Sequence, residues 1–255
     1  MRIVATSDVH GNLTKLEIPD GDVLILAGDI LADYDYGFSW SQAKTKADAD
    51  RMQWEELQKL NEFLSTLPHK VKILVGGNHD YALEKMGKAE VKKALTNGVY
   101  LQDEELIYEG IRFYGYPWVP NLKGMAFYAE GFWRNKWTND IPRGTDVVVS
   151  HGPPLRVMDG AYMQRDVHYG CEYLRDRMLA IEPKLHIFGH VHSGRGRQRI
   201  RATEYYNVAC CDEKYHPGGA PVVIDVDEKC NVTNFKLEPH VPGDGPSKKS
   251  GILWE

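Results

Sequence analysis

The stretch LHIFGHVH (residues 185–192) decides the fold, because an apolar run ends there in a glycine and two closely spaced histidines. Leu185, Ile187 and Phe188 fit a short strand that is buried on both faces. His190 and His192 then stand in the turn beyond that strand. Two histidines alone indicate little, so the rest of the chain must supply partners that are placed in the same way.

The same pattern recurs at four other places in the chain. Short apolar, β-branched runs cover residues 3–5, 23–26, 71–75 and 147–149. Polar residues beside small ones follow these runs: Asp8 and His10, then Asp29, then Asn78 and His79, then His151. Ligands of open α/β sheets bind outside the carboxyl ends of the strands. Five strand ends can therefore converge on one cleft, and the intervening glycines allow the backbone to turn sharply there.

Helical patterns separate these runs. Residues 41–67 carry Trp54, Leu57, Leu60 and Leu64 at helical spacing, and residues 171–181 form a second expected helix that ends before Glu182-Pro183. Strands that alternate with helices predict an α/β fold. From residue 197 onward, four short strand-like runs (197–200, 204–208, 221–225 and 232–237) predict a second, mostly antiparallel sheet packed on the first.

Composition and charge restrict the class of protein. The chain has 255 residues, of which 42% are hydrophobic and 26% charged, and its formal net charge is −5. These values fit a soluble globular protein and disfavour a general binder of nucleic acid or anionic membranes. We expect one domain over residues 1–240 and a loop-rich tail over 241–255. No apolar run reaches 18 residues and the amino terminus shows no signal peptide, so we expect a cytoplasmic protein without membrane association.

The four cysteines point to the same compartment. Cys171, Cys210, Cys211 and Cys230 form no CxxC pair, and two of them are adjacent. We interpret them as free thiols in a reducing cytosol rather than as disulfides or a zinc-thiolate site.

The polar residues at the strand ends are oxygen and imidazole donors without sulfur. That set suits Mn²⁺, Mg²⁺, Fe or Zn²⁺ and is too large for one tetrahedral ion. Two metals about 3.5–4 Å apart would use all the donors and form a hydrolytic centre. A carboxylate should bridge them, because its two oxygens can serve two cations, and Asp29 is the natural candidate.

The ordered set DxH, GD, GNHD, SHGPP and GHVH resembles the calcineurin-like metallophosphoesterases over residues 1–226. Finer features, including GDVLILAGDI, YGYPWVP and PKLHIFG, resemble one subgroup, the metallophosphoesterase-domain-containing proteins, which are similar to class III cyclic-nucleotide phosphodiesterases. The resemblance implies a four-layer α/β/β/α sandwich of two mixed sheets.

The resemblance also implies roles for the matching positions. Asp8, His10, Asp29 and His192 would bind one metal, and Asp29, Asn78, His151 and His190 would bind the other. His79 would be the catalytic histidine near the scissile phosphate. The cofactor would be two divalent ions, Mn²⁺ in the first place, with Fe, Zn²⁺ or Mg²⁺ as alternatives. The motifs assign no substrate-binding residue.

This chain departs from its relatives at two positions. Animal members of the subgroup replace the first histidine of GHxH by glycine, whereas this chain keeps His190 and should hold both metals. Many family phosphatases carry an acid three residues after the bridging aspartate, where this chain has Ala32. Asp33 and Asp80 are both candidates for the acid partner of His79.

The resemblance to this subgroup implies a phosphoesterase that hydrolyses phosphodiesters, including cyclic nucleotides or other nucleotide-sized esters. A hydroxide bridging the two metals would attack phosphorus in line, and His79 would protonate the leaving oxygen. A phosphomonoesterase and a metal-dependent nuclease are alternatives on the same site. A non-catalytic scaffold is disfavoured because no ligand position is lost. Nucleic-acid binding and the oligomeric state stay open.

Two other stretches have competing interpretations. Arg195, Arg197, Arg199 and Arg201 alternate after the GHVH motif and could read phosphates, although a solvated sheet face is favoured. Tyr114, Tyr116, Trp118 and the aromatic residues of 127–137 could line a cleft and stack a base. Packing of a long loop onto the sandwich is the favoured interpretation of that stretch.

Overall fold

The computed structural model describes residues 1–33, 43–161 and 164–240. The expected tail over 241–255 and the first residues of the expected helix, 41 and 42, lie outside the described residues.

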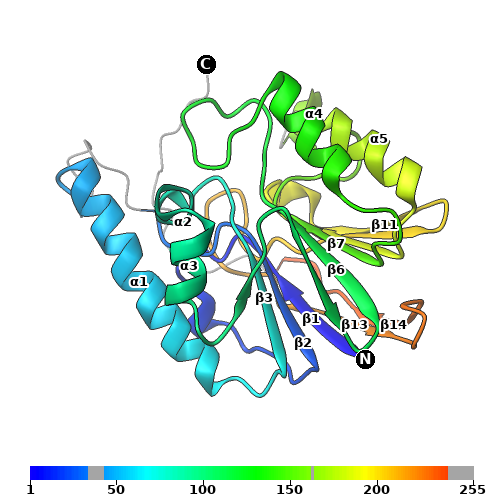
Figure 1. Cartoon of the computed structure of the whole chain (residues 1–255), viewed down its shortest axis with the longest axis horizontal. Helices are drawn as coiled ribbons and strands as arrows, with labels where there is room; N and C mark the ends of the chain where they lie inside the picture. Colours follow the sequence, from blue (N-terminus) through cyan, green and yellow to red (C-terminus); the bar gives the residue numbers. More distant parts are fainter. Residues whose placement is uncertain (34–42, 162–163, 241–255) are drawn as a thin grey trace.

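Two six-stranded sheets form the centre of the molecule (Figure 1). The first sheet has the order β14-β13-β1-β2-β3-β4, with β1 Arg2–Thr6, β2 Val23–Ala27, β3 Val71–Val75, β4 Val99–Tyr100, β13 Val222–Val226 and β14 Val232–Lys236. Strands β1 to β4 run parallel, β13 runs antiparallel to β1, and β14 runs antiparallel to β13. The sheet is therefore mixed.

The second sheet has the order β11-β12-β10-β7-β6-β5, with β5 Glu104–Tyr108, β6 Ile111–Tyr116, β7 Val147–Ser150, β10 Leu185–Phe188, β11 Gly196–Ile200 and β12 Thr203–Asn207. Its four central strands are parallel and both edge strands are antiparallel. A small hairpin, β8 Gly160–Ala161 and β9 Gln164–His168, stands apart from both sheets.

The helices cover the outer faces of the two sheets (Figure 1). They are α1 Lys46–Thr66, α2 Tyr81–Met86 and α3 Lys88–Ala94 beside the first sheet, and α4 Gly131–Asp140 and α5 Glu172–Ile181 beside the second. Two short 3₁₀ turns, η1 Leu13–Lys15 and η2 His192–Gly194, follow β1 and β10.

Three buried clusters hold these layers together. Side chains such as Ile25 and Val149 meet between the sheets, Leu24 and Leu60 belong to the cluster under α1, and Phe188 and Met178 belong to the cluster under α5. Apolar burial of this kind is the main favourable contribution to folding. The predicted four-layer α/β/β/α sandwich of two mixed sheets is confirmed.

The expected grouping of the C-terminal strands is wrong. They do not form a sheet of their own, because β11 and β12 join the second sheet while β13 and β14 extend the first beside β1. After β12 the chain crosses to the carboxyl end of β1, where Ala209 pairs with Ser7, and then returns antiparallel along β1. The sequence pattern identifies strands but does not show which open sheet edge each one will pair with.

Helix α1 starts later than expected and buries a different stripe. Thr45 and Asp48 form a reciprocal capping box at its start, which fixes the first turn. Leu57, Leu60 and Leu64 are buried as expected, but Trp54 is 38% exposed and Gln53 is buried in its place. The second expected helix is confirmed as α5, with Cys171 as its N-cap.

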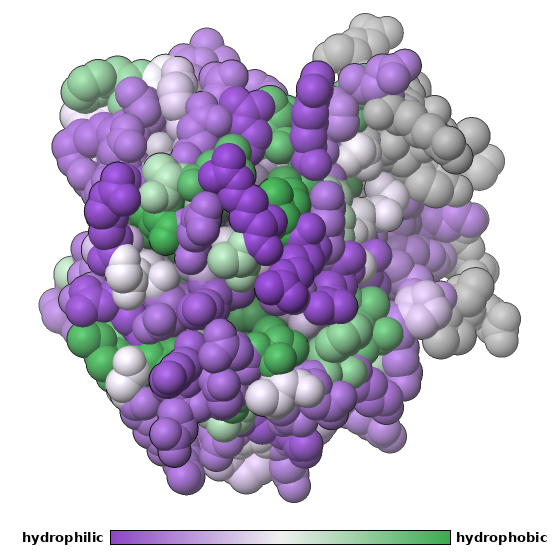
Figure 2. Space-filling model, turned by 90° about the vertical axis from the view of Figure 1, so that its right-hand side faces the viewer, coloured by the Kyte–Doolittle hydropathy of each residue, from purple (hydrophilic) through white to green (hydrophobic). Residues whose placement is uncertain are grey.

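The surface on the side of β11 and β14 is mostly hydrophilic, and its hydrophobic residues form small separate patches (Figure 2). Among the described residues, no helix combines the length and the apolar character that a membrane span requires.

Candidate metal centre

The predicted ligands lie together at the carboxyl ends of strands from both sheets. Two trios of side chains each place their ligand atoms within 4.8 Å of one another. The first trio is Asp8, His10 and His192, and the second is Asp29, His151 and His190. Each trio combines residues that follow β1 or β2 of the first sheet with residues that follow β7 or β10 of the second. Asn78 adjoins the second trio, since its Oδ1 lies 2.9 Å from His151 Nε2.

The two trios lie where the carboxyl ends of the two sheets meet, which we call the seam between the sheets. Hydrogen bonds at this seam fix the side chains of both trios. The backbone N–H of His190 donates to both carboxylate oxygens of Asp8, at 3.1 and 3.0 Å. His151 Nδ1 lies 3.0 Å from the carbonyl of Ala27, and His192 Nδ1 lies 2.8 Å from the carbonyl of Asp212. Carbonyl partners at Nδ1 select the tautomer that leaves Nε2 as the ligand atom.

The backbone at these strand ends is strained. Asp8, His10, Asp29 and His190 adopt the left-handed region, with φ values of 55°, 41°, 50° and 68°. Each such residue costs about 1–3 kcal/mol unless its surroundings enforce it, and strain of this kind clusters at functional sites. Gly28 also has a positive φ, 91°, and a Cβ at this position would overlap the ring of His151.

His79 lies beside the first trio and is held by Asp33. Asp33 contacts two imidazoles, His79 Nδ1 at 2.5 Å and His10 Nδ1 at 3.0 Å. The backbone N–H of His79 donates to Asp29 Oδ1 at 2.8 Å, which links it to the second trio. Asp80, the other candidate partner, instead accepts backbone N–H groups of Ile30, Leu31 and Gly77. The structure therefore favours Asp33 as the acid partner.

The charges of this cluster perturb the protonation of its members. Burial lowers the pKa of His79, but the charges of Asp29 and Asp33 outweigh burial and raise it to about 10. Burial and the neighbouring His151 lower the pKa of His190 to about 3. Burial and the charge of Asp29 raise the pKa of Asp80 to about 7. The charges of Asp29 and Asp33 thus favour the protonated form of His79, and burial favours the neutral form of His190.

Gln53 supports the site from helix α1, although no sequence pattern indicated a role for it. Its side chain donates to the carbonyls of His79 at 2.7 Å and Ala32 at 3.1 Å, and it accepts from the N–H of Ala82 at 2.9 Å. Its position could have indicated this role, because Gln53 is the polar first member of the buried stripe 53, 57, 60 and 64. Gln53 joins the Asp33 segment to the His79 segment.

The donor set fits a hard or borderline divalent cation. Both trios consist of carboxylate and imidazole groups, and Asn78 adds an amide oxygen. His10 Nε2 is buried and has no hydrogen-bond partner among the described residues, as expected for an atom that serves as a metal ligand. All four cysteines are buried and free, and neither trio contains one. The residues present therefore suit the divalent ions that the motifs imply.

The four alternating arginines lie beside carboxylates and carbonyls, which supports the favoured sheet-face interpretation. Arg197 pairs with Glu204 at 2.9 Å, and Arg199 lies 3.7 Å from the same carboxylate. Arg201 pairs with Glu182 at 3.2 Å. Arg195 turns inward and donates to backbone carbonyls, including that of Ala209 at 2.8 Å. Arg197 and Arg199 thus share one carboxylate, and the side chains of Arg199 and Arg201 are 66% and 60% exposed.

The aromatic stretch divides between core and surface. Tyr114 and Tyr116 are buried under α4 and α5, which confirms packing as their role. Trp118 stacks on Trp137 with ring centroids 3.9 Å apart. Trp133 on α4 is 56% exposed. A different aromatic residue, Tyr215, contacts the metal centre, and no sequence pattern indicated it.

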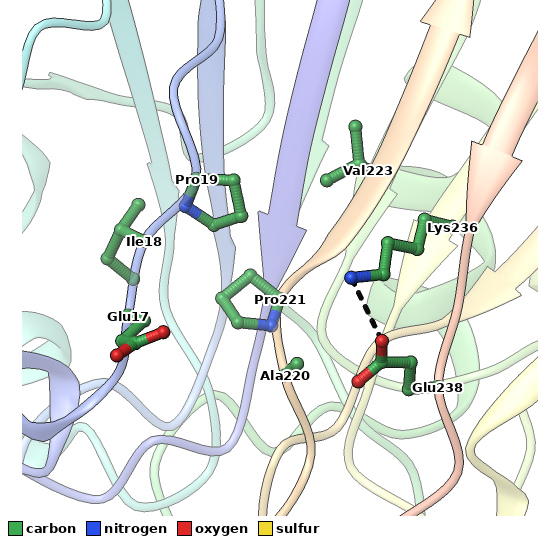
Figure 3. Close-up of a pocket in the computed structure, with 8 residues that line it drawn as sticks. All are labelled: Glu17, Ile18, Pro19, Ala220, Pro221, Val223, Lys236 and Glu238. Atoms are coloured by element: carbon green, nitrogen blue, oxygen red, sulfur yellow. Dashed lines mark ion pairs between the residues drawn. The ribbon is translucent and has the colours of Figure 1, made fainter.

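A surface hollow of about 430 Å³ lies elsewhere (Figure 3). It is lined by Glu17, Ile18, Pro19, Ala220, Pro221, Val223, Lys236 and Glu238. Lys236 and Glu238 form an ion pair at 2.9 Å. No member of either trio lines this hollow, so it is separate from the metal centre.

Comparison with known proteins agrees with this geometry. Residues 1–194 match the sequence model of the calcineurin-like phosphoesterase family. Metallophosphoesterase domain-containing protein 1 from Homo sapiens and its Mus musculus counterpart are each 34% identical over 252 residues, covering 88% of this chain and 71% of theirs.

Solved structures share the fold at low sequence identity. One superposes with a TM-score of 0.63 at 16% identity, covering 94% of this chain and 99% of that one. Phosphopantetheinyl hydrolase from Mycobacterium tuberculosis superposes with a TM-score of 0.53 at 14% identity, covering 84% of this chain and 90% of the hydrolase.

A two-sheet sandwich with carboxylate and histidine trios at its strand ends defines a metal-dependent phosphoester hydrolase. This chain belongs to the calcineurin-like phosphoesterase family.

Proposed function

We propose that this protein is a dinuclear-metal phosphodiesterase that acts on nucleotide-sized esters. The observation that carries the proposal is the convergence of two ligand trios on one seam, with His79 beside them. Asp8, His10, Asp29 and His192 would hold one ion, and Asp29, Asn78, His151 and His190 the other. Two observations support Asp29 as the bridge. Its Oδ2 lies 3.1 Å from Nε2 of His151 in the second trio, and its carboxylate interacts electrostatically with His10 of the first trio.

Bound divalent ions, with Mn²⁺ as the first candidate, would supply charge stabilisation at phosphorus and an acidified water. The protein's own contribution is orientation. Carbonyl partners at Nδ1 aim the Nε2 atoms of His151 and His192 into the site. His79, held protonated by Asp29 and Asp33, would donate its proton from Nε2 to the departing oxygen.

The charge of the site favours diesters over monoesters. In the described part of the chain, no ion pair joins a lysine or arginine to either trio or to Asp33. A phosphomonoester is close to dianionic at neutral pH and gains from additional cationic side chains, whereas a diester carries one negative charge. Beside the trios, His79 adds a positive charge when it is protonated, and the charges of Asp29 and Asp33 raise its pKa to about 10.

A substrate comparison tests the proposal. The metal-stripped protein is loaded with Mn²⁺ and given bis-p-nitrophenyl phosphate, p-nitrophenyl phosphate and cyclic nucleotides in parallel. We expect kcat/KM for the diester to exceed that for the monoester, and turnover to require the metal. The metal-stripped protein and the Asp29→Ala variant are the controls. Monoester turnover well above diester turnover would overturn the diester assignment.

A further inference from the structure

One aromatic ring lies against the histidines of the metal centre. Tyr215 makes edge-to-face contacts with His10, His192 and His79, at centroid separations of 4.7, 5.2 and 6.0 Å. His10 and His192 belong to the first trio, and His79 is the proposed proton donor. The ring of Tyr215 therefore borders both the first metal position and the acid that serves the departing oxygen.

The loop that carries Tyr215, residues 211–217, is built to hold the ring in place. Asp212 organises it, since its carboxylate accepts the N–H groups of Lys214 and His216 at 2.8 and 3.0 Å. The N–H of Tyr215 donates to the carbonyl of Asp212 at 2.9 Å, and Asp212 and His216 pair through a second backbone bond of 2.9 Å. The same carbonyl of Asp212 lies 2.8 Å from His192 Nδ1, so the loop and a metal ligand share one anchor.

Tyr215 has a backbone conformation that a bulky residue rarely adopts. Its φ is 62°, in the left-handed region. Glycine or asparagine would relieve the strain at this position, and the strained turn directs the tyrosine ring at three histidines.

We infer that Tyr215 forms the wall of the leaving-group pocket and favours substrates whose departing alcohol carries a flat ring, such as a phenol or a nucleoside. This inference rests on the proposed function, because it uses His79 as the marker of the leaving-group side. Because the ring contacts both His79 and His10, a group that leaves next to His79 would lie within its reach. Aromatic side chains recognise flat rings by offset stacking or edge-to-face contact.

The test measures binding rather than turnover. Phenylphosphonate and methylphosphonate are inert at phosphorus and differ only in the ring, and their Kd values on the Mn²⁺-loaded full chain are obtained by calorimetry. We expect wild type and Tyr215→Phe to prefer phenylphosphonate by about five- to tenfold. Tyr215→Leu, which removes the ring, should bind the two phosphonates about equally. Trp133→Leu on α4 is the matched control and should keep the preference.

Metal content is measured for each variant, and Tyr215→Met replaces Tyr215→Leu if the latter binds less metal or fails to fold. An undiminished preference for phenylphosphonate in a metal-replete, ring-free variant would overturn the inference. If Trp133→Leu alone lost the preference for phenylphosphonate, the ring would be recognised by α4. That result would also contradict the role of Tyr215.

The two proposals fail in different ways. If no phosphodiester is hydrolysed but the preference for phenylphosphonate depends on Tyr215, the proposed function is wrong and the role of Tyr215 is supported. If diesters are hydrolysed while the ring-free Tyr215 variants keep the preference for phenylphosphonate, the proposed function is supported and the role of Tyr215 is wrong.

Discussion

Two regions of this molecule gather charged side chains, and they do so in opposite ways. In the arginine run, 195–201, the charges are adjacent in sequence, and each one is met by a neighbouring carboxylate or carbonyl, as Arg197 is by Glu204. In the metal centre the charges are far apart in sequence, as Asp8 and His192 are, yet they meet at the seam between the sheets. Some of their atoms, such as His10 Nε2, have no partner among the described residues.

The comparison shows that density of charge along the sequence is a poor guide to a site. Each arginine of the run 195–201 already has a neighbouring carboxylate or carbonyl as its partner. The metal centre instead collects buried carboxylates and imidazoles whose desolvation is costly without a bound cation. Unsatisfied groups that the topology brings together are the better signal, and variants in both regions can test that distinction.

The largest effect is expected from Asp29→Ala. This change removes the proposed bridge and the carboxylate that contacts His151 and the N–H of His79. We expect both metals to be lost and turnover of bis-p-nitrophenyl phosphate to fall to the level of the metal-stripped protein. Metal analysis of the purified variant checks this. Two metals at full occupancy would contradict the bridging role.

His79→Gln should separate catalysis from metal binding. We expect both metals to remain and kcat for a diester with an alkyl leaving group to fall by about 10²–10⁴-fold. The loss should be smaller for p-nitrophenyl esters, because p-nitrophenolate departs without a proton. Steady-state kinetics on the two ester types, with metal content measured beside them, provides the comparison. Equal losses on both would argue against a proton-donor role.

Asp33→Asn should change the pH dependence of kcat. The charges of Asp29 and Asp33 raise the pKa of His79 to about 10, so His79 stays protonated through neutral pH and loses its proton as pH rises through that value. Removing the charge of Asp33 lowers this pKa. The basic limb of the kcat profile for an alkyl diester should therefore move to lower pH by about 1–3 units. A profile that coincides with that of wild type would exclude Asp33 as the partner.

Arg197→Ala should have the smallest effect on activity. We expect kcat/KM for bis-p-nitrophenyl phosphate to stay within about twofold of wild type, because the run 195–201 is satisfied locally. The free energy of unfolding should fall by about 1–2 kcal/mol, since the change leaves Glu204 with only the more distant Arg199. Urea unfolding and kinetics on the same preparation measure both. A large, salt-dependent loss of activity would restore the arginines as a substrate-binding face.

The fold and the donors of this protein were largely predictable because both depend on local patterns. Apolar runs such as 71–75 predict buried strands, and the polar residues that follow them, such as Asn78, predict a shared rim. Sheet membership was not predictable, since β13 pairs with the open edge of β1 across more than 200 residues of sequence.

Supporting residues were harder to foresee than the ligands. Gln53 lies in a helix whose apolar spacing predicted Trp54 as the buried residue, and the hydrogen bonds of Gln53 to the backbone of Ala32, His79 and Ala82 explain the exchange. Tyr215 reaches the site through one left-handed residue in a loop that no periodicity marks. The choice between Asp33 and Asp80 depended on which carboxylate faces an imidazole and which faces backbone N–H groups.

The seam between the sheets has a further consequence. Each trio takes one part of its donors from the first sheet and the rest from the second, and the bond from His190 to Asp8 joins the two directly. The spacing of the sheets, about 10 Å for face-to-face packing, is set by core residues such as Ile25 and Val149. Core residues between the sheets therefore help to set the distance between the two halves of each trio.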